Sequence, residues 1–348
     1  MKFIDYNEEG DIVPIHWSND YDAKGDRYEV AYGNRQLLND WCSSDFNFQV
    51  SNGVGTDNFF CKESWFVKAK IKNNNKYFWG WDTINKIDPQ KNINSIFGAC
   101  PFVYTKDLFT DRKFDERYTV VFLPKSDLNY KMQLLREYTS CMELIKTLKE
   151  LNSNKTIYIA YTYDFEYYQN LLPSELKQKT YCFGSDAFDS EWSNRVLKTI
   201  RYAKKLYFNV LSTACVYSVF LNKDVDFYRV NVQGLPEDWN TKINPHRQYC
   251  FSNKPAKFFE FMDYIQNVFT NKTKETDFWL HLFLSLDLIK KPKDLYHDLL
   301  FLHDRDLDNK KLKPINIFDN SHYSKLIEKV NSLKVTPSDT TDLWTSLV

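Results

Sequence analysis

The stretch that decides the fold is Leu206-Tyr-Phe-Asn-Val-Leu-Ser-Thr-Ala-Cys-Val-Tyr-Ser-Val-Phe-Leu221. Residues 206–210 are rich in β-forming side chains, which predicts a buried strand. Residues 214–221 are apolar on almost every side, which predicts a helix packed near the centre of the fold. Ser212 and Thr213 lie between them, where a hydroxyl can cap the first helical turn. Asn222 tolerates left-handed backbone, so we expect it to end the helix.

The same alternation of strand and helix continues on both sides of this stretch. Short β-rich runs predict further strands at residues 118–123, 155–161, 180–183 and 225–230. Apolar side chains at helical spacing predict helices between them, at residues 130–151, 165–172 and 191–204. Because parallel strands are joined by right-handed crossovers through helices, this order predicts a doubly wound parallel sheet of the α/β class.

The regions on either side of this sheet predict two further parts. In the first 112 residues, β-rich runs at 11–16, 65–71 and 77–81 predict strands. Residues 33–42 predict a helix. After residue 236 the pattern becomes helical, with candidate helices at 255–270, 277–290, 292–302 and 322–333. We therefore expect a smaller N-terminal α/β domain over 1–112, the doubly wound domain over 113–236, and a helical C-terminal region over 237–348 that packs back on both.

Composition excludes several classes of protein. The chain has 348 residues with 43% hydrophobic side chains, enough for a sizeable core, and its 9 Gly exclude a collagen-like or linker-type chain. Its 46 Lys and Arg balance 46 Asp and Glu, so general nucleic-acid binding, which depends on phosphate neutralisation, is not expected. The first ten residues carry charges where a signal peptide needs an apolar run, and the seven Cys are scattered without a C-x-x-C pair. We therefore expect a reduced, cytoplasmic protein.

Aromatic residues make up 17% of the chain, which indicates either dense packing or a surface that stacks on sugars or bases. In the central strand–helix unit, Phe208, Tyr217 and Phe220 fit packing. Four aromatic residues lie beside the candidate site residues described below and are candidates for stacking, namely Trp79, Trp81, Tyr161 and Tyr163.

Residues 278–289 give a strongly apolar helix signal that is followed by Lys290 and Lys291. Such a helix either belongs to the core or lies on a membrane surface with its lysines toward anionic lipid. We expect the core, and peripheral association with the inner membrane is the alternative.

Candidate ligand-binding residues follow from the rule that open parallel sheets bind ligands beyond the carboxyl ends of their strands, near helix N-termini. The N–H groups and the helix dipole there favour anions such as phosphate. Four strand–helix junctions satisfy this rule, and their candidate side chains are Lys125, Ser126 and Asp127, then Tyr163, Asp164 and Glu166, then Ser185, and finally Ser212 and Thr213. Each also has a simpler interpretation as a helix cap or a turn residue.

Signals for a metal or for other phosphate-binding motifs are weak. The chain has no G-x-x-x-x-G-K-[ST], and its six His show no H-E-x-x-H spacing. The acidic pairs at residues 224 and 226 and at residues 304 and 306 resemble pairs that hold a metal–nucleotide, but the first starts a predicted strand after a helix end, where one carboxylate would be a cap. We therefore expect no metal site and no resident cofactor.

A general base must be a carboxylate or a histidine near the ligand cleft. In the first 112 residues the candidates are His16, Asp57 and Asp82. Asp57 and Asp82 have Gly neighbours, which let a ligand approach the backbone closely.

The order of these features resembles the GT-B glycosyltransferases that build bacterial surface polysaccharides, and most closely the sialyltransferase-like enzymes that use CMP-activated acidic sugars. In that group a Ser-Ser or Ser-Thr pair at a helix start binds the nucleotide phosphate, and Leu211-Ser-Thr213 before its apolar helix looks like this unit. The family often has a His-Pro motif at an earlier turn, where this chain has Leu123-Pro-Lys-Ser-Asp127 without His. The family's acidic acceptor-domain motif is also not evident. The resemblance covers roughly residues 75–235.

The resemblance implies a GT-B-like fold in which residues 1–112 bind the acceptor and residues 113–236 bind the nucleotide sugar. It implies metal-independent, inverting transfer of a sugar, such as an acidic sugar from a CMP donor, to a glycan or glycolipid acceptor in the synthesis of capsule or lipopolysaccharide. Ser212, Thr213 and Lys125 would then bind the donor phosphate, while Tyr163, Asp164 and Glu166 would line the base or ribose.

Two other functions fit the same sequence. A non-catalytic glycan-binding or assembly protein would use the doubly wound domain as a scaffold and the aromatic residues as a stacking surface. A polysaccharide pyruvyl transferase would share the architecture but transfer a different group. A non-catalytic glycan-binding protein would have no affinity for nucleotides, unlike a glycosyltransferase. A pyruvyl transferase would give a product of different mass from that of sugar transfer.

Overall fold

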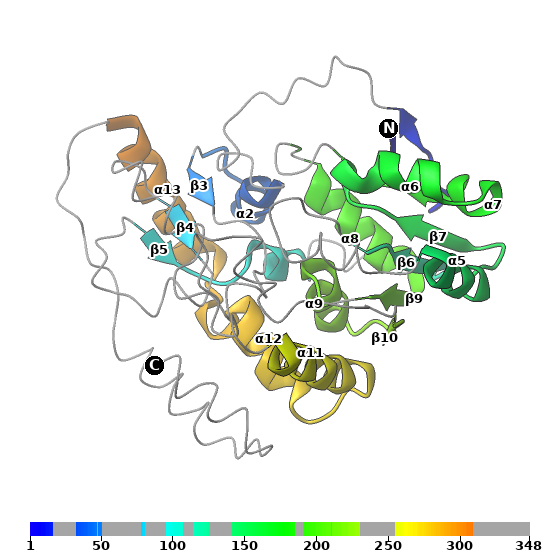
Figure 1. The fold of residues 1–348 in the computed structure, drawn as a ribbon. Coiled ribbons are helices and arrows are strands. Elements are labelled where there is room, and N and C mark those ends of the chain that lie inside the picture. Colours follow the sequence, from blue (N-terminus) through cyan, green and yellow to red (C-terminus); the bar gives the residue numbers. More distant parts are fainter. Residues whose placement is uncertain are drawn as a thin grey trace.

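The computed structural model describes residues 1–16, 33–46, 48–50, 78–80, 95–106, 114–124, 141–184, 189, 191–209, 211–229 and 255–308. Its centre is a five-stranded sheet in which every neighbouring pair is parallel (Figure 1). The strands are β6 (Tyr118–Phe122), β7 (Thr156–Ile159), β8 (Thr180–Tyr181), β9 (Ala203–Phe208) and β10 (Val225–Phe227). The predicted doubly wound α/β sheet is therefore present.

The order of the strands across the sheet is β10-β9-β6-β7-β8. The chain moves outward from β6 through β7 to β8, then returns to the other side of β6 and continues through β9 to β10. This reversal is typical of Rossmann-like sheets, and it leaves β6 and β9 as neighbours at the point where the direction changes.

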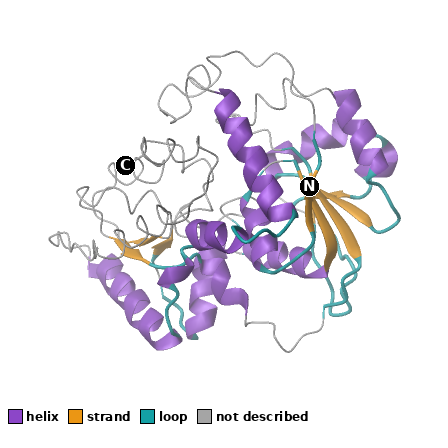
Figure 2. Ribbon diagram, turned by 90° about the horizontal axis from the view of Figure 1, so that it is seen from below, coloured by secondary structure: helices purple, strands orange, loops and turns teal. Residues whose placement is uncertain are grey.

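Helices cover both faces of the sheet, as Figure 2 shows. Side chains alternate along each strand, so Val121 and Tyr158 face one hydrophobic cluster while Val120 and Ile157 face the other. The first cluster contains side chains of α5 (Cys141–Glu150), α6 (Phe165–Leu171) and α7 (Ser174–Lys177). The second contains side chains of α8 (Trp192–Tyr202) and α9 (Thr213–Phe220).

The helix α9 confirms the prediction made from its apolar sequence. Residues 214–219 are all buried, and Phe208 on β9 and Tyr217 on α9 are each about 1% exposed. Asn222 has φ 57°, the left-handed backbone expected at the helix end. Lys272 donates from Nζ to Asn222 Oδ1 at 2.9 Å, which adds a side-chain contact to the cap.

Replacing Asn222 tests whether this backbone conformation is what selects the residue. We expect Asn222→Ala to lower the free energy of unfolding by about 1–2 kcal/mol, because a Cβ without a local hydrogen bond is strained in the left-handed region. We expect Asn222→Gly to leave it nearly unchanged, because Gly adopts this conformation freely. Urea unfolding measures both changes, and an equal loss in the two variants would show that the Lys272 contact matters instead.

The start of the chain adds a short strand to the edge of the sheet. The strand β1 (Lys2–Phe3) lies beside β8, with Ile4 N–H donating to the Cys182 carbonyl at 2.9 Å and Cys182 N–H donating to the Lys2 carbonyl at 3.0 Å. The strand β2 (Ile15–His16) pairs antiparallel with the outer side of β1. The predicted strand at 11–16 is therefore shorter than expected, and β1 was not predicted.

A second, three-stranded parallel sheet contains β3 (Gln49–Val50), β4 (Phe78–Gly80) and β5 (Ser95–Phe97). The helix α2 (Asn34–Cys42) and the 3₁₀ helix η4 (Pro101–Lys106) contribute buried side chains to the same cluster as α8 and α9. The predicted strand at 65–71 lies outside the described residues.

The C-terminal helices are α11 (Pro255–Thr270), α12 (Thr276–Leu284), the 3₁₀ helix η7 (Leu286–Leu288) and α13 (Pro292–Asp308). The prediction for 255–270 matches α11, and α12 and η7 divide the predicted helix at 277–290. Trp279 on α12 is about 1% exposed and belongs to the large core cluster, so the apolar helix packs inside the protein. The predicted helix at 322–333 lies outside the described residues. The division of the chain at residues 112 and 236 stays a prediction.

Candidate functional site

The site expected from the strand order lies where β6 and β9 end. Val121 of β6 is paired in register with Tyr207 of β9, so the two strands reach the carboxyl edge of the sheet side by side. The chain continues from β6 through Leu123 and Pro124, and from β9 toward Leu211 and Ser212. A ligand at this edge would therefore meet two of the four predicted junctions together.

Ser212 is the N-cap of α9. Its backbone is extended, with φ −131° and ψ 166°, and its Oγ accepts a hydrogen bond from the Cys215 N–H at 3.3 Å. Thr213 is the first helical residue, and both hydroxyl side chains are half-buried. The cap interpretation is thus confirmed for Ser212. The cap still leaves the first turn of α9 facing the carboxyl edge, where its N–H groups and dipole favour an anion.

The end of β6 is held by two buried tyrosines that the sequence patterns did not single out. Tyr228 donates from its hydroxyl to the Phe122 carbonyl, and Tyr168 donates to the Pro124 carbonyl, each at 2.6 Å. Both phenols are buried, and burial raises the pKa of Tyr228 well above its ordinary value. They fix the backbone up to Pro124. The predicted side chains Lys125, Ser126 and Asp127 lie outside the described residues.

At the end of β7, the structure separates the two predicted carboxylates. Asp164 ends the 3₁₀ helix η5 (Thr162–Asp164) and is about 1% exposed, whereas Glu166 is exposed on α6. Tyr161 is half-buried at the start of η5. The backbone of Tyr163 is in η5, but its side chain lies outside the description. Of these two carboxylates, Asp164 is therefore buried and Glu166 is open to solvent.

The end of β8 carries a buried ion pair that was also missed. Arg195 donates from Nη1 to Asp189 Oδ2 at 2.7 Å and to the Phe183 carbonyl at 2.8 Å. The side chains of Arg195 and Asp189 are only 3% and 1% exposed. The periodicity of α8 could have indicated this, because Arg195 lies on the helix face shared by Trp192 and Val196. The predicted Ser185 lies outside the described residues.

Of the three predicted general bases, the structure describes the backbone of His16 alone. His16 ends β2, which is separated from β9 by β1, β8, β7 and β6, and its side chain lies outside the description. Asp57 and Asp82 also lie outside the described residues, as does Trp81, and of Trp79 only the backbone in β4 is described. Their assignment stays a prediction.

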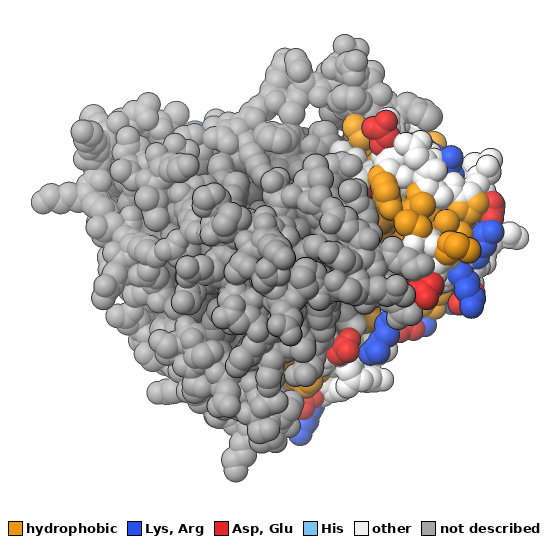
Figure 3. Space-filling model, in the orientation of Figure 1, with side chains coloured by type: hydrophobic (Ala, Val, Ile, Leu, Met, Phe, Trp, Pro, Cys, Tyr) orange, Lys and Arg blue, Asp and Glu red, His pale blue; other side chains and the backbone are white. Residues whose placement is uncertain are grey.

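Charged side chains elsewhere form ordinary pairs. Lys205 Nζ lies 3.2 Å from Asp226 Oδ2 and 4.0 Å from Asp224 Oδ2, so these two carboxylates share a lysine. Within the described ranges, no group of three or more His, Cys, Asp or Glu could hold a metal ion. On the face shown in Figure 3, acidic and basic side chains are interspersed over the described surface.

Comparison with known proteins gave no match. No protein-family model matches the chain. No curated protein matches it. No solved structure matches it either. Among the helices that the structure describes, none combines the length and the apolar character needed to cross a membrane.

Proposed function

We propose that the protein is a glycosyltransferase that transfers a sugar from a nucleotide donor to a glycan acceptor. In this reaction an acceptor hydroxyl attacks the anomeric carbon, the bond from that carbon to the nucleotide phosphate breaks, and a general base takes the acceptor proton. The nucleotide leaves with the bonding electrons as an anion. We further propose that the reaction occurs in the cytoplasm, at the inner face of the membrane, in the synthesis of a surface polysaccharide.

The observation that carries the proposal is the reversal of strand order between β6 and β9. In sheets of this kind the reversal opens a crevice at the carboxyl edge, and nucleotides commonly bind there. Ser212 caps α9 at this edge, and the N–H groups of the first turn would stabilise the negative charge on the leaving phosphate. At the end of β7, which neighbours β6, the exposed Glu166 would accept hydrogen bonds from ribose hydroxyls, while the buried Asp164 would help to fix η5.

The first test is a screen of CMP-, UDP- and GDP-sugars by thermal shift and by donor hydrolysis. We expect one donor to raise the melting temperature, because a ligand that binds only the folded state stabilises it. Release of the matching nucleotide should accompany binding. A flat response to all three donor classes in both assays would contradict the proposal.

Ser212→Ala tests the phosphate contact. We expect this variant to bind the nucleotide about tenfold more weakly or worse, because a hydrogen bond to a charged group is worth about 1.5–3 kcal/mol. Loss of the cap should also lower the free energy of unfolding by about 1 kcal/mol. Isothermal titration well below the melting temperature separates the two effects.

The matched control is Ser153→Ala, because Ser153 bonds to Thr156 at the opposite, amino end of β7. This variant should lose stability without losing nucleotide affinity. Unchanged affinity in Ser212→Ala would remove Ser212 from the site.

A stacking surface for a non-catalytic glycan-binding protein finds less support in the described part of the chain. Most described aromatic side chains are buried, and among the large hydrophobic side chains exposed there the aromatic one is Tyr296. We therefore propose the enzyme first. Signal on a glycan array from a protein without nucleotide affinity would reverse this order.

A further inference from the structure

We infer that Arg195 and Asp189 are positioning residues for the ribose side of the proposed nucleotide site. The inference rests on the proposed function, because it concerns how the carboxyl ends of β7 and β8 are held for the ligand. Neither side chain needs to touch the nucleotide. Their role is to fix the backbone that carries Thr162 and Asp164.

The ion pair is built around one nitrogen of the guanidinium. Arg195 Nη1 makes both hydrogen bonds, to Asp189 Oδ2 and to the Phe183 carbonyl, while Nε is buried without a hydrogen-bond partner in the described part of the chain. A guanidinium this deeply buried is costly unless its remaining contacts are well ordered. The ion pair therefore fixes the position of the backbone at the end of β8 and adds little to the free energy of unfolding.

Gly184 fits against this pair in a way that only glycine allows. Its φ is +150°, and a Cβ built on it would lie 2.8 Å from Arg195 Nη1 and closer still to Asp189 Oδ2. The backbone thus passes directly over the ion pair. Arg195 holds the carbonyl of Phe183, the residue before Gly184, and the side chains of Arg195 and Asp189 both lie where a Cβ of Gly184 would be.

One hydrogen bond links the end of β8 to the end of β7. Thr162 donates from Oγ1 to the Gly184 carbonyl, which links the first residue of η5 to the end of β8. Asp164 is the last residue of the same 3₁₀ helix. The positions of Arg195, Gly184, Thr162 and Asp164 are therefore connected by consecutive hydrogen bonds or backbone contacts.

The phosphate contact is held independently of this chain of contacts. Ser212 and the first turn of α9 follow β9, which is separated from β8 by β6 and β7. Removing the ion pair between Arg195 and Asp189 should therefore weaken binding of the ribose and leave binding of the phosphate unchanged. This difference separates a positioning role from a general loss of stability.

The experiment compares the affinity for the nucleoside monophosphate of the best donor with that for its 2′-deoxy analogue. We expect the wild type to bind the ribonucleotide at least about tenfold more tightly, through hydrogen bonds at the end of β7, where the exposed Glu166 follows η5. Thr162→Val removes only the link to Gly184. Thr180→Val is its matched control, because Thr180 also donates from Oγ1 to a backbone carbonyl, that of Leu176, at 2.9 Å.

A variant of the ion pair completes the set. Arg195→Met alone would leave Asp189 as a buried charge and risk misfolding, so the double variant Arg195→Met/Asp189→Leu is used, in which no lone charge remains. We expect Thr162→Val and the double variant to bind the ribonucleotide less than about threefold more tightly than its 2′-deoxy analogue. Their affinity for the 2′-deoxy analogue, which keeps the phosphate, should stay that of the wild type. Thr180→Val should keep the wild-type preference.

The outcomes separate the two ideas. If the wild type prefers the ribonucleotide and all variants keep that preference, the positioning role is overturned. If the wild type binds both nucleotides equally, the positioning role is also overturned, while nucleotide binding stands. If the wild type binds no nucleotide, the proposed function itself fails.

Discussion

At pH 11 the protein is expected to have lost most of its stability, because its buried tyrosines cannot ionise inside the fold. Among the described residues, burial raises the pKa furthest above the ordinary value of 10 for the phenols of Tyr6, Tyr104, Tyr158, Tyr217 and Tyr228. Burial also raises the pKa of the Cys100 and Cys182 thiols to about 12. All seven groups stay protonated in the folded chain and lose protons first in the unfolded chain.

The direction of the effect follows from these shifts. A folded-state pKa above the unfolded value gives stability that is complete below the unfolded pKa and is lost as the pH rises above it. Each phenol then costs about 1.4 kcal/mol at one pH unit above its unfolded pKa, so the five together cost about 7 kcal/mol at pH 11. That is comparable with the whole free energy of unfolding of an ordinary domain.

Burial is the main reason why these phenols resist ionisation, and their hydroxyl contacts act in the same direction. Tyr158 donates to the Leu148 carbonyl at 2.9 Å, and Tyr228 donates to the Phe122 carbonyl at 2.6 Å. A phenolate would face these carbonyl oxygens without a proton between them. Part of the phenolate absorbance at 295 nm should therefore rise in one cooperative step together with the loss of circular dichroism. Ionisation of all 23 tyrosines with the dichroism retained would contradict the prediction.

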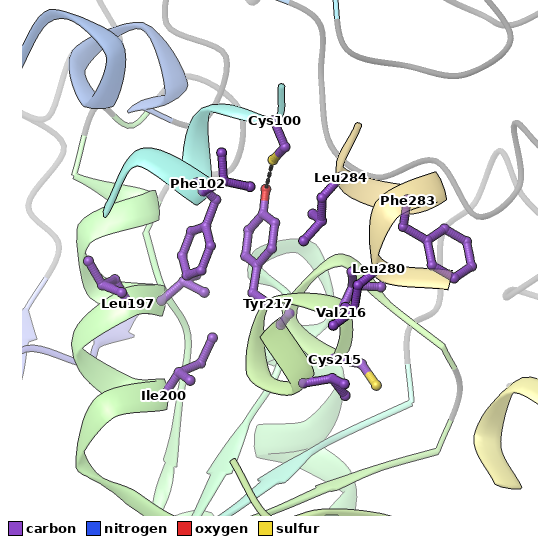
Figure 4. Packing of buried hydrophobic residues seen from close by; sticks show 14 of the residues in the cluster. Cys100, Phe102, Leu197, Ile200, Cys215, Val216, Tyr217, Leu280, Phe283 and Leu284 are labelled. Atoms are coloured by element: carbon purple, nitrogen blue, oxygen red, sulfur yellow. Dashed lines mark hydrogen bonds between the residues drawn. The ribbon is translucent and has the colours of Figure 1, made fainter. Parts of the chain in front are cut away.

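Replacing Tyr217 with Ala is expected to lower the free energy of unfolding by about 3–5 kcal/mol, the range for deleting a large buried ring. Tyr217 is about 1% exposed and stacks on Phe102 of η4 with ring centroids 3.7 Å apart and an interplanar angle of 2°. Figure 4 shows the ring between Phe102 and the leucines of α12, with its hydroxyl directed at Cys100. The residue therefore joins α9 to two elements outside the central sheet.

Tyr217→Phe is the control for this variant. It keeps the ring and removes only the contact between the hydroxyl and Cys100 Sγ, which are 3.4 Å apart. We expect a loss of about 1 kcal/mol or less, since that contact is a weak hydrogen bond. Urea unfolding followed by tryptophan fluorescence measures both variants. Similar losses in the two would show that the hydroxyl, and not the ring packing, carries the stability.

The central strand–helix order could be predicted from sequence because its signals are local. The apolar run of α9, the cap at Ser212 and the left-handed Asn222 each depend on a few adjacent residues. The helix bounds were less predictable. The helix predicted at 191–204 ends at Tyr202, because Ala203 already pairs with Tyr118 of β6. Of the helix predicted at 130–151, residues 130–140 lie outside the described residues, and α5 begins at Cys141 with Leu144 and Leu148 buried.

The contacts around the candidate site were harder to predict because they join distant segments. The hydrogen bond from Tyr168 to Pro124 spans 44 residues, and that from Tyr228 to Phe122 spans 106. No local pattern marks either pairing. Strand order, which decides where β6 and β9 meet, likewise depends on tertiary packing and not on the sequence of either strand.

The pairing of β1 with β8 has a consequence for biosynthesis. Lys2 and Cys182 are 180 residues apart, so β1 leaves the ribosome long before its partner exists. At about 5–20 residues per second, the interval is roughly 10–40 seconds. During that time β1 can pair with other chains, and until it docks, β8 presents an open edge of the kind that promotes aggregation. Chaperone demand and yield during expression should therefore depend on this two-residue strand far more than its size suggests.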